Sequence, residues 1–371
     1  MKLHRIGSAA AVLTVAALAL TACGSDSPTA TAGTAASTGG SAAAVTGTLT
    51  GSGASSQKSA MEAWKAGFEA ANPGTMGQYS PDGSGAGRKA FLAGGAQFAG
   101  SDAYLKAEEI ESSKQVCGPE GAFNVPAYVS PIAVAFNLPG VETLNLDAAT
   151  IAKIFKLGIT KWNDPAIAAM NEGVALPDTA ITVVHRNDES GTTENFVDYL
   201  SVAAKDVWTY EVSGDWPKDL ASENAKGTSG VVATTTGTEG AITYAAHSAV
   251  GKLGTVNVKV GEDFTKISSE AAAKGVEAAT PVEGRGALDM SLDLKRDTTE
   301  SGSYPIILVS YHVFCSTYKD QATVDLVKSF GEYVLSDAGQ KEAAASAGNA
   351  PLSAKMSEAA IKSIEQIAVA K

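Results

Sequence analysis

The spacing of hydrophobic residues changes repeatedly between strand and helix patterns from residue 47 onward. Met61, Trp64 and Phe68 recur at i, i+3 and i+7, which predicts one face of a helix that ends at Pro73 and Gly74. Helices are also predicted around 91–92, at 148–155 and 165–171, and from 192 onward, and strands at 47–53, 76–79, 97–100 and 181–185. This alternation of strands and helices predicts an α/β fold.

Two long apolar stretches interrupt the alternation. Residues 123–138 are rich in Val, Ile and aromatic residues, but Pro126 and Pro131 argue against one continuous central strand. We interpret this stretch as a crossing between two lobes, and residues 304–314 as a second crossing back. The predicted fold therefore has a ligand cleft between two α/β lobes, with lobe I formed by 47–129 and 304–371 and lobe II by 130–303.

The first 46 residues lie outside this pattern. Residues 1–22 combine Lys2 and Arg5 with an apolar run too short to span a membrane stably, which indicates an export signal. The sequence LTAC at its end resembles a lipobox, in which Cys23 receives lipid; the alternative is an ordinary signal peptide with an incidental cysteine. Residues 23–46 are mostly Ser, Thr, Gly and Ala, as in a tether. We expect an extracytoplasmic protein with a lipid anchor in the cell membrane.

Charge and cysteine content narrow the functional classes. Removal of Lys2 and Arg5 with the signal lowers the formal net charge from −12 to −14, which argues against nucleic acid and against an anionic lipid surface as partners. Any site for an anion must therefore depend on a local group of donors and not on the overall charge of the protein. With Cys23 lipidated, Cys117 and Cys315 form a plausible disulfide in an oxidising compartment, and two buried free thiols are the alternative.

Three turns share one chemistry. Residues 50–56 (TGSGASS), 81–89 (PDGSGAGRK) and 186–193 (RNDESGTT) each place glycine and hydroxyl residues at the start of a predicted helix. The first N–H groups of a helix lack internal partners and carry partial positive charge, so such ends can hold an anion. Each turn alone is typical of an ordinary helix cap. Their number, with Arg186 beside one of them, favours an oxyanion site.

Signals for catalysis or metal binding are weak. The G-x-x-x-x-G-K-[ST] nucleotide motif is missing, and Asp188 stands where a G-x-S-x-G motif around Ser190 needs glycine. His185, His247 and His312 show no paired ligand spacing and are interpreted as structural. We therefore predict no catalytic residue, no metal and no cofactor.

Several motifs occur in an order that resembles one family. They are LTGSGASSQKSAMEAW, YSPDGSGAG, FAGSDAYL, IFKLGITKWNDPAI, ITVVHRNDESGTTENFVDYL, KGTSGVVATTTGTEGAITYA and YPIILVSYHVF. The chain resembles the PstS-like phosphate-binding lipoproteins of Pst-type ABC transporters, members of the substrate-binding protein superfamily. The resemblance implies a periplasmic-binding-protein-like fold and a monomer that binds inorganic phosphate with high affinity. It also implies delivery to the ABC permease and ATPase subunits of a phosphate importer.

The resemblance also implies a set of ligand contacts. Arg186 would be oriented by Asp188, and Asp102 would contact the ligand. The implied phosphate-binding residues are Ser55, Ser56 through its amide, Ser84, Asp102, Arg186, Ser190, Gly191 and Thr192. Two positions depart from the family pattern: Ser56 replaces a more usual aromatic residue, and Glu189 replaces a glycine, with its side chain expected to point to solvent.

Two alternatives remain at this point. The protein could bind another oxyanion, such as sulfate, molybdate or tungstate. Less favoured is a secreted phosphoester hydrolase that uses Ser190 or Ser84 as its nucleophile.

Overall fold

The computed structural model describes residues 45–220 and 222–371. The predicted export signal, Cys23 and all but the last two residues of the predicted tether lie outside this part. None of the helices in the described part combines the length and the apolar character that a membrane span requires.

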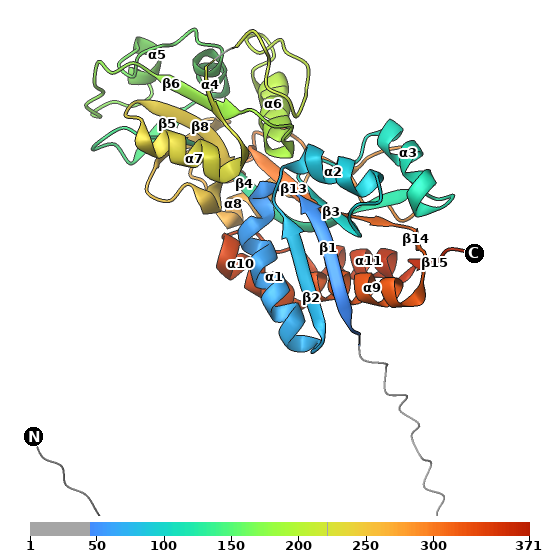
Figure 1. Ribbon diagram of the computed structural model, residues 1–371. Helices are drawn as coiled ribbons and strands as arrows, with labels where there is room; N and C mark the ends of the chain where they lie inside the picture. The colour runs from blue at the N-terminus through green and yellow to red at the C-terminus, as the bar shows by residue number, and fades with distance from the viewer. Residues whose placement is uncertain (1–44, 221) are drawn as a thin grey trace, which may run out of the picture. The chain divides into compact units, whose positions relative to one another are not determined.

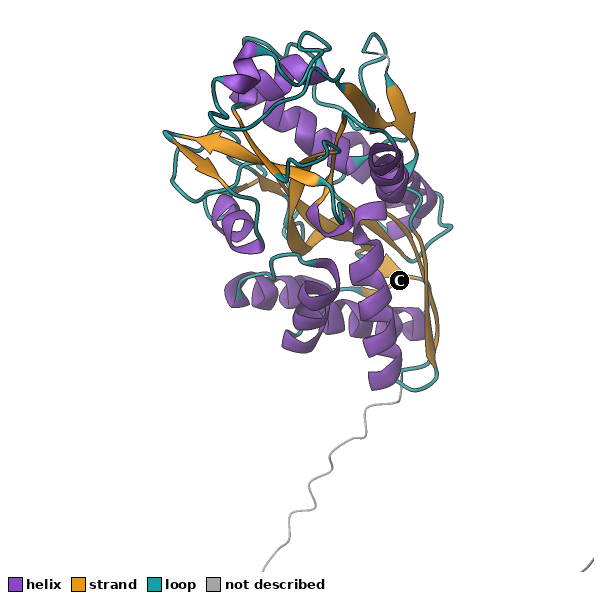
Figure 2. Cartoon of the chain, turned by 90° about the vertical axis from the view of Figure 1, so that its left-hand side faces the viewer, coloured by secondary structure: helices purple, strands orange, loops and turns teal. Residues whose placement is uncertain are grey.

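An 11-stranded sheet runs through both lobes of the described chain, and helices flank it on both sides (Figures 1 and 2). Its main strand order is β2-β1-β3-β13-β4-β8-β6-β7, and β9 joins β4, β5 and β10 to it. The sheet strands are β1 (Gly47–Gly53), β2 (Thr75–Ser80), β3 (Phe98–Ser101), β4 (Ala122–Phe136), β5 (Thr143–Leu146), β6 (Thr182–Arg186), β7 (Glu223–Ala225), β8 (Ala241–Ala246), β9 (Gly254–Val260), β10 (Asp263–Thr265) and β13 (Ile307–Cys315). Two small pairs are β11 (Thr280–Pro281) with β12 (Leu292–Asp293) and β14 (Thr317–Tyr318) with β15 (Ala368–Val369).

The helices are grouped by the ranges predicted for lobe I and lobe II. Lobe I carries α1 (Lys58–Ala71), α2 (Ser84–Leu92), α3 (Ala107–Cys117), α9 (Gln321–Leu335), α10 (Asp337–Ala347) and α11 (Ala354–Glu365), with the short 3-10 helix η1 (Ser55–Gln57) before α1. Lobe II carries α4 (Ala148–Phe155), α5 (Pro165–Ala168), α6 (Gly191–Ala203), α7 (Gly227–Gly237) and α8 (Ser269–Val276), and η2 (His247–Ala249) follows β8.

Each lobe has a point at which the strand order reverses. In lobe I, β1 lies between the parallel strands β2 and β3; in lobe II, β6 lies between the parallel strands β8 and β7. Such reversals send successive helices to opposite faces of a sheet and leave a crevice at the carboxyl ends of the strands, where ligands bind. The two reversal points therefore locate the cleft.

The strand β4 corrects one expectation. The prediction that Pro126 and Pro131 would break the apolar stretch is wrong, because β4 is continuous over 15 residues. Pro126 lies next to a register shift that leaves Ala127 without a partner in β13. Pro131 is the last residue paired with β13, and β8 becomes the partner at Ile132. Both prolines thus occupy irregular positions, where a missing N–H costs little.

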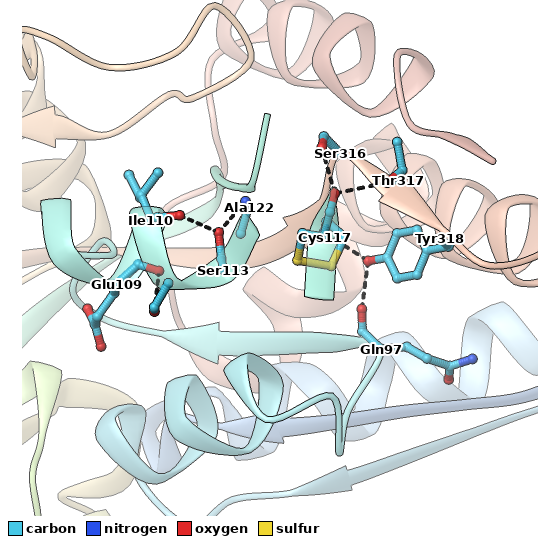
Figure 3. The surroundings of a disulfide bond; sticks show 11 residues. Gln97, Glu109, Ile110, Ser113, Cys117, Ala122, Ser316, Thr317 and Tyr318 are labelled. Atoms are coloured by element: carbon cyan, nitrogen blue, oxygen red, sulfur yellow. Dashed lines mark hydrogen bonds between the residues drawn. A yellow bond between two sulfur atoms is a disulfide. The ribbon is translucent and has the colours of Figure 1, made fainter. Parts of the chain in front are cut away.

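The structure joins Cys117 and Cys315 by a disulfide in lobe I (Figure 3). Cys117 is the last residue of α3 and Cys315 the last residue of β13, and both are buried. The hydroxyls of Ser316 and Thr317 each donate to the Cys117 carbonyl oxygen at 2.9 Å. The disulfide and these bonds fix the end of α3 to the strand that returns from lobe II.

Candidate functional site

The helix starts that follow the two reversal points converge on one region. From lobe I come η1 after β1, the first turn of α2, and Asp102 directly after β3. From lobe II come Arg186 at the end of β6 and the first turns of α6 and α7. The region therefore combines the starts of four helices with Arg186 and Asp102.

Asp102 is at the centre of this region. Only 2% of its surface is exposed, and its carboxylate accepts three hydroxyl hydrogen bonds. The donors are Ser56 at 2.5 Å and Thr192 at 2.9 Å to Oδ2, and Ser310 at 2.7 Å to Oδ1. The Asp102 amide donates to the Ser84 hydroxyl oxygen at 3.2 Å. A buried carboxylate is therefore surrounded by hydroxyl groups from both lobes.

Arg186 and Asp188 form a buried pair. Arg186 Nε donates to Asp188 Oδ1 at 2.7 Å, and a terminal nitrogen donates to Oδ2. The Gly227 amide at the start of α7 also donates to Oδ1 at 3.0 Å. Burial works against the charged form of Asp188, but Arg186 and the Gly227 amide hold the pKa of this carboxyl below its ordinary value. This pair leaves the second terminal nitrogen of Arg186 for other acceptors.

The arginine pair lies against the start of α2. A Cβ added at Gly83 would lie 2.5 Å from Asp188 Oδ2 and 3.6 Å from the terminal nitrogen Nη2 of Arg186. Gly83 also has a φ of 107°, which favours glycine. Ser84 follows directly, so the structure brings Arg186 next to the helix start that also contacts Asp102.

The first turn of α6 approaches Asp102 closely. A Cβ at Gly191 would lie 2.8 Å from the Asp102 Cβ, so only glycine allows this approach. Ser190 caps the helix, and its hydroxyl oxygen accepts from the Thr193 amide at 3.2 Å. Asn195, one turn further on, donates to the Asp102 carbonyl oxygen at 2.7 Å. These contacts position Gly191 and Thr192 against lobe I.

Ser55 contacts a helix that the sequence reasoning left out of the site. The Thr228 amide in α7 donates to Ser55 Oγ at 3.0 Å, and the two hydroxyl oxygens are 3.1 Å apart. Thr228 and Ser310 are thus additional site residues. The KGTSG sequence repeats the glycine–hydroxyl pattern of the other turns and could have identified Thr228. Ser310 stands in a mostly apolar strand, and its only signal in the sequence is that a serine occurs there.

The two residues that depart from the family pattern, Ser56 and Glu189, both make side-chain contacts in the structure. Ser56 was assigned a role through its amide alone, but its side chain also donates to Asp102. Glu189 does not point to solvent as expected: its carboxylate contacts Arg88 at 2.8 Å and Lys89 at 2.7 Å, and 26% of the side chain is exposed. The residues next to Glu189 in the sequence could not reveal these contacts, because Arg88 and Lys89 lie about 100 residues earlier in the chain.

His185 and His312 lie in packed surroundings, whereas His247 is partly exposed. His185 stacks on Trp216, with ring centroids 5.2 Å apart, and its Nδ1 is 2.8 Å from the Arg186 carbonyl oxygen. His312 is enclosed by aromatic rings, and burial lowers its pKa to about 3. Among residues 45–220 and 222–371, no group of three or more His, Cys, Asp or Glu is placed to hold a metal ion.

Comparisons with known proteins agree with this architecture. Residues 34–338 match the PBP superfamily domain. Phosphate-binding protein PstS 3 of Mycobacterium leprae is 40% identical, over 89% of this chain and 90% of that protein, and PstS 2 of Mycobacterium tuberculosis is 37% identical with the same coverage. The structure of a phosphate-binding protein from Stenotrophomonas maltophilia, 20% identical, superimposes with a TM-score of 0.65 over 85% of this chain and 93% of that one. The chain therefore belongs to the PstS family of phosphate-binding proteins, within the PBP superfamily.

Proposed function

We propose that this protein binds inorganic phosphate between its two lobes, outside the cytoplasmic membrane, and delivers it to an ABC permease for import. The observation that carries the proposal is the buried Asp102 carboxylate within a set of hydroxyl, amide and guanidinium donors. Ser55, Ser56, Ser84, Ser190, Gly191 and Thr192 would bind phosphate oxygens together with Arg186, and Asp188 would hold the guanidinium in place.

Phosphate fits the carboxylate better than other oxyanions do. Near neutral pH phosphate keeps at least one hydroxyl, which can donate to Asp102, whereas sulfate is fully ionised and can only accept. Thr228 and Ser310 extend the set of hydroxyl groups to α7 and β13. The names of the mycobacterial relatives support phosphate over molybdate or tungstate as the ligand.

The hydrolase alternative has less support. A serine nucleophile needs a base within hydrogen-bond reach. The Ser84 hydroxyl accepts from the Asp102 amide and the Ser190 hydroxyl accepts from the Thr193 amide, so both make structural contacts. His185, five residues before Ser190, directs Nδ1 at a carbonyl oxygen instead. We propose that the protein performs no chemistry and acts as a monomer, anchored by lipid on Cys23, with the permease and ATPase on other chains.

Calorimetry with the chain that follows the predicted signal tests this proposal. We expect one phosphate per chain and much weaker binding of sulfate, molybdate and tungstate at neutral pH and fixed ionic strength. Tighter binding of another oxyanion would show that this anion, and not phosphate, is the ligand. Hydrolysis of a phosphomonoester that is lost in Ser190→Ala or Ser84→Ala would favour the hydrolase instead.

A further inference from the structure

A carboxylate of lobe II reaches across the cleft to a helix of lobe I. Glu189 lies in the turn between β6 and α6, whereas Arg88 and Lys89 belong to α2, which lies close to α6 in Figure 1. One carboxylate oxygen contacts Arg88 and the other contacts Lys89, at 2.8 and 2.7 Å. The Glu189 carbonyl oxygen also accepts from the Gly85 amide at 3.2 Å. Both the side chain and the backbone of Glu189 thus contact α2.

The partners of Arg88 indicate which contacts would remain if the lobes separated. The Arg88 side chain is 2% exposed and also contacts Glu109 at 2.9 Å and the Ser101 hydroxyl at 3.2 Å, both in lobe I. Arg88 therefore keeps partners within its own lobe in an open form, while Lys89, 74% exposed, is free to return to solvent. Only Glu189 loses both of its cations. Its contacts consequently stabilise the closed form alone.

A second ion pair crosses the cleft but is weaker. Lys226 of lobe II contacts Asp82 of lobe I at 3.2 Å, and both side chains are more than half exposed. Exposed pairs contribute little because water and salt screen them. Glu189 is about three-quarters buried and has two cations, one of them fully buried. The Glu189 contact therefore dominates the charge interactions at this edge of the cleft.

We propose that Glu189 is a cross-lobe clamp, which stabilises the closed form through Arg88 and Lys89 and slows the release of bound ligand. The residue acts by positioning the lobes and is not itself assigned a contact with the anion. This inference takes phosphate as the ligand, and in that respect it rests on the proposed function.

Glu189→Gln removes the charge and keeps the shape of the side chain. Asp178→Asn is the matched control, because it makes the same change of charge in an exposed pair with Lys161 that lies within lobe II. The readouts are the phosphate dissociation rate by stopped-flow and the radius of gyration of the ligand-free protein by small-angle X-ray scattering, at low and high salt. We expect phosphate to leave Glu189→Gln about three to ten times faster than the parent at low salt, with the control unchanged.

High salt should reduce the difference in dissociation rate between parent and variant. Salt screens the attraction of Glu189 for Arg88 and Lys89 in the parent, and this attraction is largely lost in Glu189→Gln. Equal dissociation rates in parent and Glu189→Gln at low salt would overturn the clamp, and so would an equal acceleration in the control. If the parent does not bind phosphate, the proposed function is wrong. The scattering measurement alone then tests whether Glu189 stabilises the closed form. A ligand-free parent that expands with salt while the variant does not would then support the clamp, and identical salt responses would overturn it.

Discussion

We propose that Asp102 is the residue on which selectivity depends. Its buried negative charge would favour an anion that brings a hydroxyl to share. A fully ionised anion would have no hydroxyl to donate to this carboxylate and would be repelled by its charge, at a cost on the order of several kcal/mol. On this proposal, rejection of sulfate requires no steric barrier.

Asp102→Asn should narrow the ratio of phosphate to sulfate affinity, chiefly because sulfate gains affinity. The amide removes the negative charge and can donate to an acceptor-only anion. Calorimetry at neutral pH and fixed ionic strength measures the ratio, and Asp178→Asn controls for the loss of one charge elsewhere. A variant that excludes sulfate as strongly as the parent would show that selectivity has another origin.

Arg186→Ala should weaken phosphate binding by roughly 3–5 kcal/mol, because the anion loses a charged partner and Asp188 is left buried without its arginine. Titration of parent and variant with phosphate gives this difference. The double variant Arg186→Ala with Asp188→Asn should recover part of the loss, since it removes the unpaired charge. Affinity close to that of the parent in Arg186→Ala would place this residue outside the ligand contacts.

At the level of elements, the disulfide between α3 and β13 closes a long loop. Its cysteines are 198 residues apart, and the loop contains all of lobe II. In the chain-entropy account, a cross-link over such a distance restricts the unfolded chain strongly. The stabilisation should therefore act on the whole chain although the bond lies within lobe I.

Replacing Cys117 and Cys315 together by alanine should lower the free energy of unfolding by about 2–5 kcal/mol. Urea denaturation measures the change, and the parent protein under reducing conditions should resemble the variant. Mass spectrometry of the unreduced protein provides an independent check. Two free thiols there, or equal stability of parent and variant, would contradict the disulfide.

Element positions were largely predictable, because periodicity and turn residues are local signals. The helix predicted at 148–155 has these bounds in α4, and the strand predicted at 181–185 is shifted by one residue in β6. The helix predicted at 165–171 ends earlier, at Ala168 in α5. The continuity of β4 was missed because tolerance of proline depends on a bulge and on a change of partner strand, neither of which is written in its own sequence.

The candidate site was predictable only where the motifs recur. The three glycine–hydroxyl turns and Arg186 identified most of the residues now seen together. The role of Ser310 and the direction of Glu189 depend on which elements lie side by side in space, because their contacts join residues 208 and 100 positions apart and leave no local trace. Thr228 also meets its partner over 173 positions, but it stands in a glycine–hydroxyl motif that was not carried into the predicted site.

At the scale of the whole molecule, the first strand of the described residues, β1, begins at Gly47, the residue after the predicted tether. The predicted lobe boundary at 129–130 falls inside β4, shortly before its partner changes at Ile132. Cys23, outside the described residues, is the predicted point of attachment to the membrane.

Cys23→Ala should yield a protein without lipid that leaves the membrane fraction, because the acyl chains attach at this thiol and stable anchoring normally needs more than one chain. Fractionation and intact-mass measurement of the exported protein test the prediction. Retention at the membrane with the mass of the parent protein would rule out the lipid anchor. Phosphate affinity should not change, since Cys23 is not among the predicted ligand-binding residues.

The continuity of β4 also has a mechanical consequence. One unbroken strand spans both lobes, so rotation of one lobe against the other twists a hydrogen-bonded ribbon instead of bending a loop. Pro131 stands where β4 exchanges its partner strand, and proline has no N–H to lose when that point flexes. The lobes are thus joined by a continuous strand as well as by loops, and its change of partner at residues 131–132 is the place where one lobe could turn relative to the other with the fewest ladder hydrogen bonds disturbed.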